Sequence, residues 1–490
     1  MKHINVELAG ALMLCVLRVA FARPEPGEIF REYFWDPGRV RVGVKWDETN
    51  HGSKIFTGPS MDLDKAVRAE AEIQKVLCHD GTTGLSIKMN GKEWLTFPEA
   101  DAIPEPQQNY QHMTYPNVEI PTGHLKDGAN TFQLKVDLDD SFNQNLIYGI
   151  VFRVYYSGDK PHASGSLTSP TAGGSIGMTA DFSVEADGSA EKVEYIGWYR
   201  DFNWEGDGVY TQWHYHFFHE DLKRHVGTST DGPGFVCSWN TEWIPDQPES
   251  MKFMAKIHGP DGIISTTPAV EGVTFDRGKH VVELCTTWNV PKKWVTRKGN
   301  HSCNFEVTGD LSEAVDAKMV FCSWSPGYAN GIGVNGHEVI KSEGAKYRCH
   351  WHEIPTPVEY LQAGENTAFT NKTPRYDGKM VHGMEVNWPG ICVLVRYESD
   401  AQTSSGPSRG RGERRPAFTV SSEAVTRPQL IRIYRLSGES MPYRRSGSAG
   451  GCLLLEPVDA ASGIYYAWPV DNSERATIRP DPGRRHHDTH

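Results

Sequence analysis

Apolar and polar residues alternate in short runs along most of the first 400 residues of this 490-residue chain. Alternation of this kind is the pattern of a half-buried β-strand, and the runs 148–156 and 389–397 show it clearly. Between the runs no stretch has the repeat of a long amphipathic helix, and Gly and Pro, 48 and 30 in number, supply turn signals. The pattern therefore predicts an all-β protein made of antiparallel β-sandwiches.

Two segments, 64–156 and 311–397, repeat one order of features. Each contains an Asn-Gly pair, Asn90-Gly91 in the first and Asn335-Gly336 in the second, which supplies the positive φ of a tight hairpin turn. Each continues with a polar Leu-x-x-Gly-x-Asn turn and ends in an alternating strand. The repeat predicts two β-sandwiches of about 90–120 residues, within the usual size of a domain.

This order of strands and turns resembles that of the jelly-roll, galactose-binding-like domains. The resemblance covers about residues 50–157 and 308–398. Domains of that family are mostly non-catalytic and often bind carbohydrate, sometimes with a structural calcium ion. The resemblance implies two such domains in this chain, at 23–157 and 276–398.

The remaining segments differ from the repeat. Residues 160–275 keep short strand-like runs with regular turn signals and resemble the immunoglobulin-like modules of bacterial secreted proteins, so we expect an Ig-like β-sandwich there. From residue 401 onward the chain has 13 Arg and no Lys and opens with a Ser-, Gly- and Arg-rich stretch. Residues 399–490 are therefore predicted to be a low-complexity, disordered tail, or a segment foreign to the rest, and we place no function there.

The N-terminus predicts export from the cell. Lys2 precedes a mostly apolar stretch, and Ala20-Phe21-Ala22 has the small-x-small form of a cleavage site, so residues 1–22 are interpreted as a signal peptide. Glu7 and Arg18 interrupt this pattern. Elsewhere no apolar run reaches the ~18 residues that a membrane-spanning helix needs. We therefore expect a secreted or cell-surface protein without a transmembrane segment.

Composition excludes several classes of function. A net charge of −12 and a pI of about 5.9 argue against a nucleic-acid partner. The chain has no H-E-x-x-H motif and no P-loop. Its cysteines form no C-x-x-C pair, and several lie inside apolar strand-like runs, which indicates buried free thiols. One or two disulfides remain an open alternative.

Aromatic residues in or near the turns of the two repeats are candidates for carbohydrate binding. Sugar rings present C–H faces that pack on aromatic planes, while neighbouring polar groups bind the hydroxyls. The alternative is that each ring belongs to a core, and with 14 Trp in the chain most do. The candidates are Trp94, Tyr110, Tyr115, Trp324, Tyr328 and Trp351.

Three short patterns could hold a metal ion. The segment Asp201, Asn203, Glu205 and Asp207 places oxygen ligands at alternate positions, like a calcium loop, although Gln212 stands where a bidentate Glu belongs. On a strand, His214 and His216 would project to one face, with His219 or His225 as a third ligand. His350 and His352 form a similar pair. Calcium is the preferred ion, and zinc or copper suits the histidines.

Three hypotheses follow, in this order of preference. The first is a secreted, non-catalytic protein that binds a polysaccharide or glycan. The second is a structural or adhesive surface protein that binds a protein partner. The third is an enzyme, either a metal-dependent oxidoreductase or a polysaccharide-degrading enzyme, which uses the histidine clusters.

Overall fold

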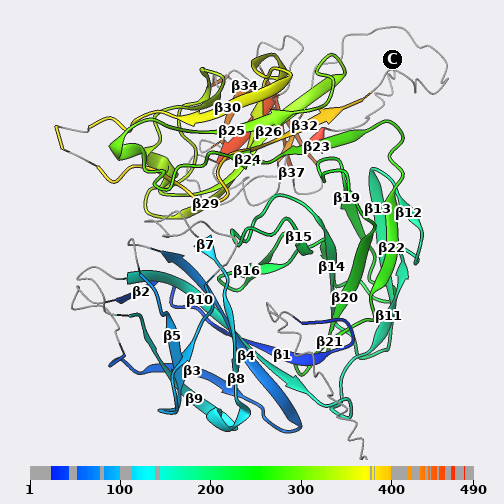
Figure 1. Cartoon of the computed structure of the whole chain (residues 1–490). Helices are drawn as coiled ribbons and strands as arrows, with labels where there is room; N and C mark the ends of the chain where they lie inside the picture. Colours follow the sequence, from blue (N-terminus) through cyan, green and yellow to red (C-terminus); the bar gives the residue numbers. More distant parts are fainter. Residues whose placement is uncertain are drawn as a thin grey trace, which may run out of the picture.

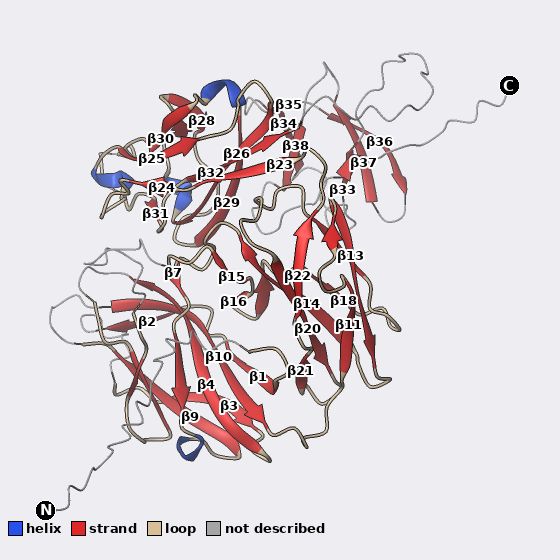
Figure 2. Cartoon of the chain, turned by 45° about the vertical axis from the view of Figure 1, so that its right-hand side comes forward, coloured by secondary structure: helices blue, strands red, loops and turns tan. Residues whose placement is uncertain are grey.

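The chain is an all-β, multi-domain β-sandwich, seen here in a computed structural model (Figure 1). The structure describes residues 24–43, 52–77, 82–99, 113–137, 144–375, 378–379 and 381–398, and beyond them only the backbone of strands between Phe418 and Pro480. In these residues the helical elements are four short 3-10 turns (Figure 2). The predicted signal peptide lies outside the described residues. The described part contains no helix that is long and apolar enough to cross a membrane.

The first unit is a sandwich of two sheets, blue to cyan in Figure 1. One sheet contains β1, β10 and β4 in that order, and the other has the order β3-β9-β5-β6. Apolar residues of both sheets, such as Ile73 and Phe132, meet in one buried core. The elements are β1 (Ile29–Trp35), β2 (Val40–Gly43), β3 (Phe56–Met61), β4 (Ala66–Leu77), β5 (Ser86–Met89), β6 (Leu95–Thr96), β7 (Met113–Thr114), β8 (Asn117–Ile120), η1 (Thr122–His124), β9 (Gly128–Lys135) and β10 (Gln144–Tyr156).

The second unit is mainly green in Figure 1. Its sheet β11-β13-β19 packs against strands that include β14, β20 and β22. Its core contains Phe182, Tyr195 and Phe253. The elements are β11 (Gly165–Ser169), β12 (Ser175–Ile176), β13 (Thr179–Ala186), β14 (Lys192–Arg200), β15 (Thr211–Trp213), β16 (His216–Phe218), β17 (Asp221–Lys223), β18 (Gly227–Ser229), β19 (Cys237–Asn240), β20 (Met251–His258), β21 (Ile264–Thr266) and β22 (Val270–Phe275).

The third unit is again a sandwich, with sheets of order β23-β32-β26-β29 and β24-β25-β30-β27-β28. Its core contains Phe305, Met319 and Val393. The elements are β23 (Val281–Cys285), β24 (Thr287–Trp288), η2 (Thr296–Lys298), β25 (His301–Val307), β26 (Ala314–Trp324), η3 (Pro326–Tyr328), β27 (Ile332–Val334), β28 (His337–Ile340), β29 (Cys349–Thr356), η4 (Val358–Tyr360), β30 (Gly364–Thr370), β31 (Glu385–Val386) and β32 (Cys392–Tyr397).

The first and third units share one topology, which confirms the internal repeat. The order β1-β10-β4-β8 corresponds to β23-β32-β26-β29, and β3-β9-β5-β6 corresponds to β25-β30-β27-β28. The matched strands follow one another along the chain in the same order in both units. The assignment of both units to the galactose-binding-like fold, and of the second to the Ig-like fold, stays a prediction.

The repeated turns carry identical hydrogen bonds in the two units. Asn130 is buried, and its amide donates to the carbonyls of Lys126 and Gly128, while its Oδ1 accepts from Lys126 N and Asn90 Nδ2 at 2.8–2.9 Å. Asn366 makes the equivalent four bonds, and its side-chain donor is Asn335 Nδ2 at 2.7 Å. The Asn-Gly hairpin and the Leu-x-x-Gly-x-Asn turn are therefore one structural device.

A continuous sheet of 13 strands joins the first and second units. The joint is the antiparallel pair β1 and β21, in which Phe30 lies opposite Ile264. On its other side β1 pairs with β10, where Phe30 lies opposite Tyr155. Backbone hydrogen bonds therefore make these two units parts of one sheet.

Buried charges cluster where these two units meet. Arg153 is fully buried, and its guanidinium lies 2.9 Å from Glu32, 3.2 Å from Glu70 and 3.0 Å from Glu72. Lys256, from β20 of the second unit, contacts Glu32 at 3.0 Å. Because burying charges is costly unless they are paired, each member of this cluster depends on the others.

The described cysteines are free thiols, as predicted. Cys285, Cys303, Cys322 and Cys392 are buried in the third unit, and Cys237 and Cys349 are half-buried. No disulfide joins any two of the described residues. Burial raises the pKa of the Cys303 thiol to about 12, which keeps it protonated and unreactive at neutral pH.

Seven short strands are assigned in the tail and pair among themselves. The remaining residues of the tail lie outside the described ones, so its predicted disorder stays a prediction. The strands are β33 (Phe418–Val420), β34 (Ile431–Arg435), β35 (Ser440–Met441), β36 (Tyr443–Ala449), β37 (Cys452–Pro457), β38 (Tyr465–Pro469) and β39 (Arg479–Pro480).

Candidate functional site

A cavity of about 270 Å³ lies between the second and third units. The second unit supplies the end of β14 with the turn that follows it, the turn after β17, and β19 with the turn that follows it. The third unit supplies β26, β29 and β32. We call it the interdomain cavity, and it is lined by Tyr199, Asp201, Trp204, Arg224, His225, Trp239, Asn240, Trp243, Ile244, Lys318, Glu353 and Leu394.

Aromatic rings form much of the wall of the interdomain cavity. Tyr199, Trp204 and Trp239 are nearly buried, while Trp243 is half-buried and packs against the core of the third unit. The Arg224 guanidinium lies 3.4 Å from the centre of the Trp204 ring, and Lys318 Nζ lies 4.5 Å from that of Trp243. These cation–π contacts fix two of the rings in place.

Glu353 holds the two cations of the interdomain cavity together. Its carboxylate contacts Arg224 Nη2 and Lys318 Nζ, each at 2.6 Å. Burial opposes the negative charge on Glu353, but Arg224 and Lys318 outweigh it and hold the pKa of this carboxyl well below its usual range. For Lys318, burial prevails over the attraction of Glu353 and lowers the pKa of the ammonium group.

Asp201 brings a second carboxyl group to the same cavity. One oxygen accepts a hydrogen bond from the Phe202 backbone N–H at 2.7 Å, and the other accepts one from Trp204 Nε1 at 3.2 Å. Burial raises the pKa of Asp201, against the opposing effects of His214 and Arg224. The pKa values of the two carboxyl groups in the interdomain cavity are thus shifted in opposite directions, upward for Asp201 and downward for Glu353.

The proposed calcium loop forms part of this wall. Its members Asp201, Asn203, Glu205 and Asp207 are all buried. Glu205 contacts Gln212 Nε2 at 2.8 Å and His216 Nδ1 at 3.2 Å, away from the bonds that Asp201 makes. Among the described His, Cys, Asp and Glu residues, this loop forms no group of three with metal-binding proximity. Calcium binding by these residues stays a prediction.

His214 and His216 occupy different environments. His214 is buried against Tyr199, whose backbone carbonyl lies 2.5 Å from Nε2. His216 is buried against Tyr115, with Nδ1 close to Glu205. Strand β15 ends at Trp213 and β16 begins only at His216, so the strand spacing assumed from the sequence does not hold here. The structure does not bring these two histidines into a three-ligand group.

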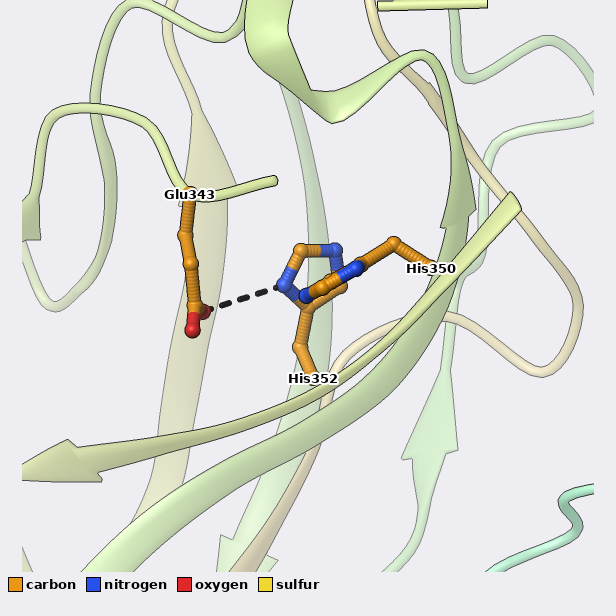
Figure 3. Close-up of side chains that lie close together, drawn as sticks. All are labelled: Glu343, His350 and His352. Atoms are coloured by element: carbon orange, nitrogen blue, oxygen red, sulfur yellow. Dashed lines mark hydrogen bonds and ion pairs between the residues drawn. The ribbon is translucent and has the colours of Figure 1, made fainter. Parts of the chain in front are cut away.

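His350 and His352 do gain a third neighbour. Both lie on β29, and Glu343 reaches them from the preceding loop (Figure 3). One ligand atom from each of the three lies within 4.8 Å of the other two. Glu343 was not predicted, because nothing in the sequence indicates that its loop folds back over β29.

Three of the six predicted aromatic platforms are covered. Tyr115, Trp324 and Tyr328 are buried, with exposed fractions of 5%, 2% and 7%. Trp324 Nε1 donates to the Tyr148 hydroxyl of the first unit at 3.2 Å, so this ring connects two units. Rings packed in this way offer no free face to a sugar.

The other three candidate rings are not among the buried ones. Trp94 is half-buried, and Lys88 and Lys135 lie over its ring. Trp351 is half-buried and packs on Phe218, with ring centres 4.7 Å apart. Tyr110 lies outside the described residues.

Of the residues that line the interdomain cavity, the sequence indicated only Asp201 and His225, and it indicated them as metal ligands. One signal was present: Lys318 interrupts the apolar face of a strand that continues as Met-Val-Phe-Cys. A lysine at such a position is rarely buried without a partner. The identity of that partner, Glu353, follows only from the pairing of β26 with β29.

A buried acid near Trp324 gives a testable prediction. Glu385 lies opposite Trp324 in the sheet, is fully buried, and has His382 Nδ1 at 3.1 Å. Burial raises the pKa of Glu385 well above its usual value, against the attraction of Arg297, and burial lowers that of His382 to about 4. The folded protein therefore prefers a neutral Glu385. The contribution of Glu385 to the free energy of unfolding is fully present below the pKa that this group has in the unfolded chain, and it is lost as the pH rises towards the pKa of the folded state.

Glu385→Gln is expected to remove the loss of stability that ionisation of Glu385 causes at high pH. The free energy of unfolding at pH 8 should rise by about 1 kcal/mol or more, since one pKa unit corresponds to about 1.4 kcal/mol. Urea denaturation at pH 5 and pH 8 measures it, and the gain should be larger at pH 8. An equal effect at both pH values would contradict the prediction.

Comparisons with known proteins give only weak likenesses. No protein-family model matches the chain, and the curated proteins contain no match. Among solved structures it is similar to BuGH86wt in complex with neoagarooctaose, with a TM-score of 0.21 and 11% identity over 50% of this chain and 35% of that chain. It is also similar to BpGH86A, a beta-porphyranase of glycoside hydrolase family 86 from the human gut bacterium Bacteroides plebeius, with a TM-score of 0.18, 11% identity and coverages of 50% and 39%.

A further likeness is to the ANXUR2 extracellular domain from Arabidopsis thaliana, with a TM-score of 0.16, 10% identity and coverages of 75% and 90%. The chain spans little more than a third of the length of the two glycoside hydrolase family 86 proteins. TM-scores of this size do not establish a shared fold.

Proposed function

We propose that this protein is a secreted, non-catalytic carbohydrate-binding protein that holds a neutral sugar unit in the interdomain cavity. The observation that carries the proposal is the lining of that cavity, which combines the aromatic side chains of one Tyr and three Trp with four charged side chains. Binding sites for small ligands usually combine aromatic walls with a few well-placed polar groups. The cavity has this composition.

The charges of the cavity favour a neutral ligand. Two carboxyl groups, Asp201 and Glu353, lie with two cationic groups, Arg224 and Lys318, so neither sign of charge dominates the lining. Carboxyl, guanidinium and ammonium groups together offer both acceptors and donors, which is what the hydroxyls of a sugar require. The half-buried Trp243 is the ring that a pyranose would contact with its C–H face.

The test is a binding experiment with a matched control. Wild-type protein and Trp243→Ala are titrated by calorimetry with the glycans that a polysaccharide and oligosaccharide panel selects. Trp243→Ala is expected to weaken binding at least about tenfold, because central aromatic residues dominate such sites. Trp288→Ala, which removes an exposed tryptophan outside the cavity, should leave the affinity unchanged. Absence of glycan binding, or equal affinities of wild type and Trp243→Ala, would refute the proposal.

One observation favours a second candidate, glycoside hydrolysis. The pKa of Asp201 is raised and that of Glu353 is lowered, which are the directions expected of a proton donor and of its ionised partner. Glycosidases use two carboxyl groups in such roles. Release of reducing ends from a bound glycan, abolished in Asp201→Asn, would support this candidate. Binding without any cleavage would leave the non-catalytic function.

A further inference from the structure

Glu343, His350 and His352 form a compact group of potential metal ligands in the third unit (Figure 3). The two histidines are two residues apart on β29, so both side chains project to the same face of the strand. Glu343 belongs to the loop between β28 and β29. Glu353, which lines the interdomain cavity, is adjacent to His352 and projects to the opposite face of β29. The group is therefore separate from the proposed sugar site.

The loop that carries Glu343 is held tightly against β29. Gly344 has a φ of +103°, and a Cβ at this position would lie 2.6 Å from Pro326 Cγ and 3.1 Å from His350 Cγ. Only glycine fits such a backbone without displacing the His350 ring. Tyr347 N donates to Ser325 Oγ at 2.9 Å, which fastens the other side of the loop. The ligand atoms are positioned before any ion binds.

His352 is oriented in the way expected of a metal-bound imidazole. Its ring is buried and stacks on Phe321, with ring centres 4.2 Å apart. Nε2 lies 2.8 Å from Ser323 Oγ, and Nδ1 lies 3.2 Å from Glu343 Oε2. The Ser323 hydroxyl can accept a hydrogen bond from Nε2–H, and in that tautomer the Nδ1 lone pair faces the carboxylate. A cation between Nδ1 and that carboxylate would satisfy both groups, and the serine would fix the ring.

We propose that Glu343, His350 and His352 bind one divalent transition-metal ion, for which zinc is the best match. Two imidazole nitrogens and one carboxylate oxygen are a donor set that zinc uses, with a fourth position for water or another ligand. With bonds of about 2.1 Å, tetrahedral donors lie about 3.4 Å apart, close to the present separation of Nδ1 and Oε2. His350 needs only a small movement to join them, since all three ligand atoms already lie within 4.8 Å.

The test is a zinc titration of the full chain. His486, His487 and His490 at the C-terminus could bind the same ion, so the experiment uses a reference chain that carries His486→Ala, His487→Ala and His490→Ala. After chelator treatment and dialysis, Zn²⁺ alone is added in competition with a chromophoric indicator. One equivalent should bind, and it should raise the melting temperature, because an ion that binds only the folded state stabilises it.

Variants of the ligands decide whether this group holds the ion. Glu343→Gln and His350→Ala are each expected to weaken zinc binding at least about 100-fold, and Ser323→Ala about tenfold through loss of orientation. His337→Ala removes an exposed histidine of the same unit and should change nothing. Circular dichroism shows whether each variant folds.

Two results would overturn the proposal. One is a reference chain that binds no zinc, and the other is a stoichiometric ion that Glu343→Gln and His350→Ala both retain. Replacing Zn²⁺ with Co²⁺ gives an independent readout, because the visible absorption of the ion reports its ligands. A spectrum unchanged between the reference chain and folded His350→Ala would likewise exclude this site.

Discussion

Arg153→Met is expected to lower the free energy of unfolding by about 3–5 kcal/mol, the usual cost of removing one partner of a buried ion pair. The substitution keeps the volume of the side chain but leaves Glu32, Glu70 and Glu72 without the guanidinium that contacts all three. Lys256 still pairs with Glu32 and Arg68 still pairs with Glu70, so the main loss falls on Glu72. Burial already raises the pKa of Glu70, and without Arg153 this carboxyl should take up a proton on folding.

Urea denaturation followed by tryptophan fluorescence measures the change. The control is Lys65→Met, which removes an ion pair with Asp159 at the surface and should cost less than about 1 kcal/mol. Without the Arg153 charge, the buried carboxylates bind protons more readily in the folded protein. The loss of unfolding free energy in Arg153→Met should therefore shrink as the pH falls from 7 to 5. A loss of less than 1 kcal/mol at pH 7 would show that the cluster does not depend on Arg153.

Asn130→Ala and Asn366→Ala should have similar effects in two different units. Each removes four hydrogen bonds from a buried turn and leaves backbone groups of Lys126 or Gln362 unpaired. At about 1 kcal/mol for each bond, the expected loss is about 2–4 kcal/mol in either case. Differential scanning calorimetry should show the loss in the transition of the unit that carries the substitution.

The matched control for this pair is Asn330→Ala. Its side chain makes a single exposed hydrogen bond, to the Lys372 carbonyl at 3.2 Å, and its loss should stay within about 0.5 kcal/mol. If Asn130→Ala and Asn366→Ala differ by more than 2 kcal/mol, the two turns are not equivalent in energy despite their identical bonds.

The sequence predicts the repeat well because its signals are local. Asn90 and Asn335 adopt φ values of 47° and 49°, and such a turn restricts the residue types that can form it. Alternation within a strand is likewise a property of a few neighbouring residues. For the same reason the all-β class and the buried thiols followed from short segments alone.

The sites depend on contacts between distant segments, which short patterns do not encode. His214/His216 and His350/His352 have the same spacing in the sequence, yet only the second pair has a carboxylate beside both rings. The difference arises from a loop that folds back over β29. The interdomain cavity combines residues from two units, so no single stretch of sequence contains its pattern.

The joint between β1 and β21 also affects how the chain is made. Phe30 leaves the ribosome more than 230 residues before its partner Ile264. At about 5–20 residues per second, this edge of β1 waits on the order of 10–50 s for its neighbour during synthesis. An unpaired edge strand is a template for pairing with another chain. Until β21 has been made, the nascent first unit therefore exposes a strand edge with which another chain could pair.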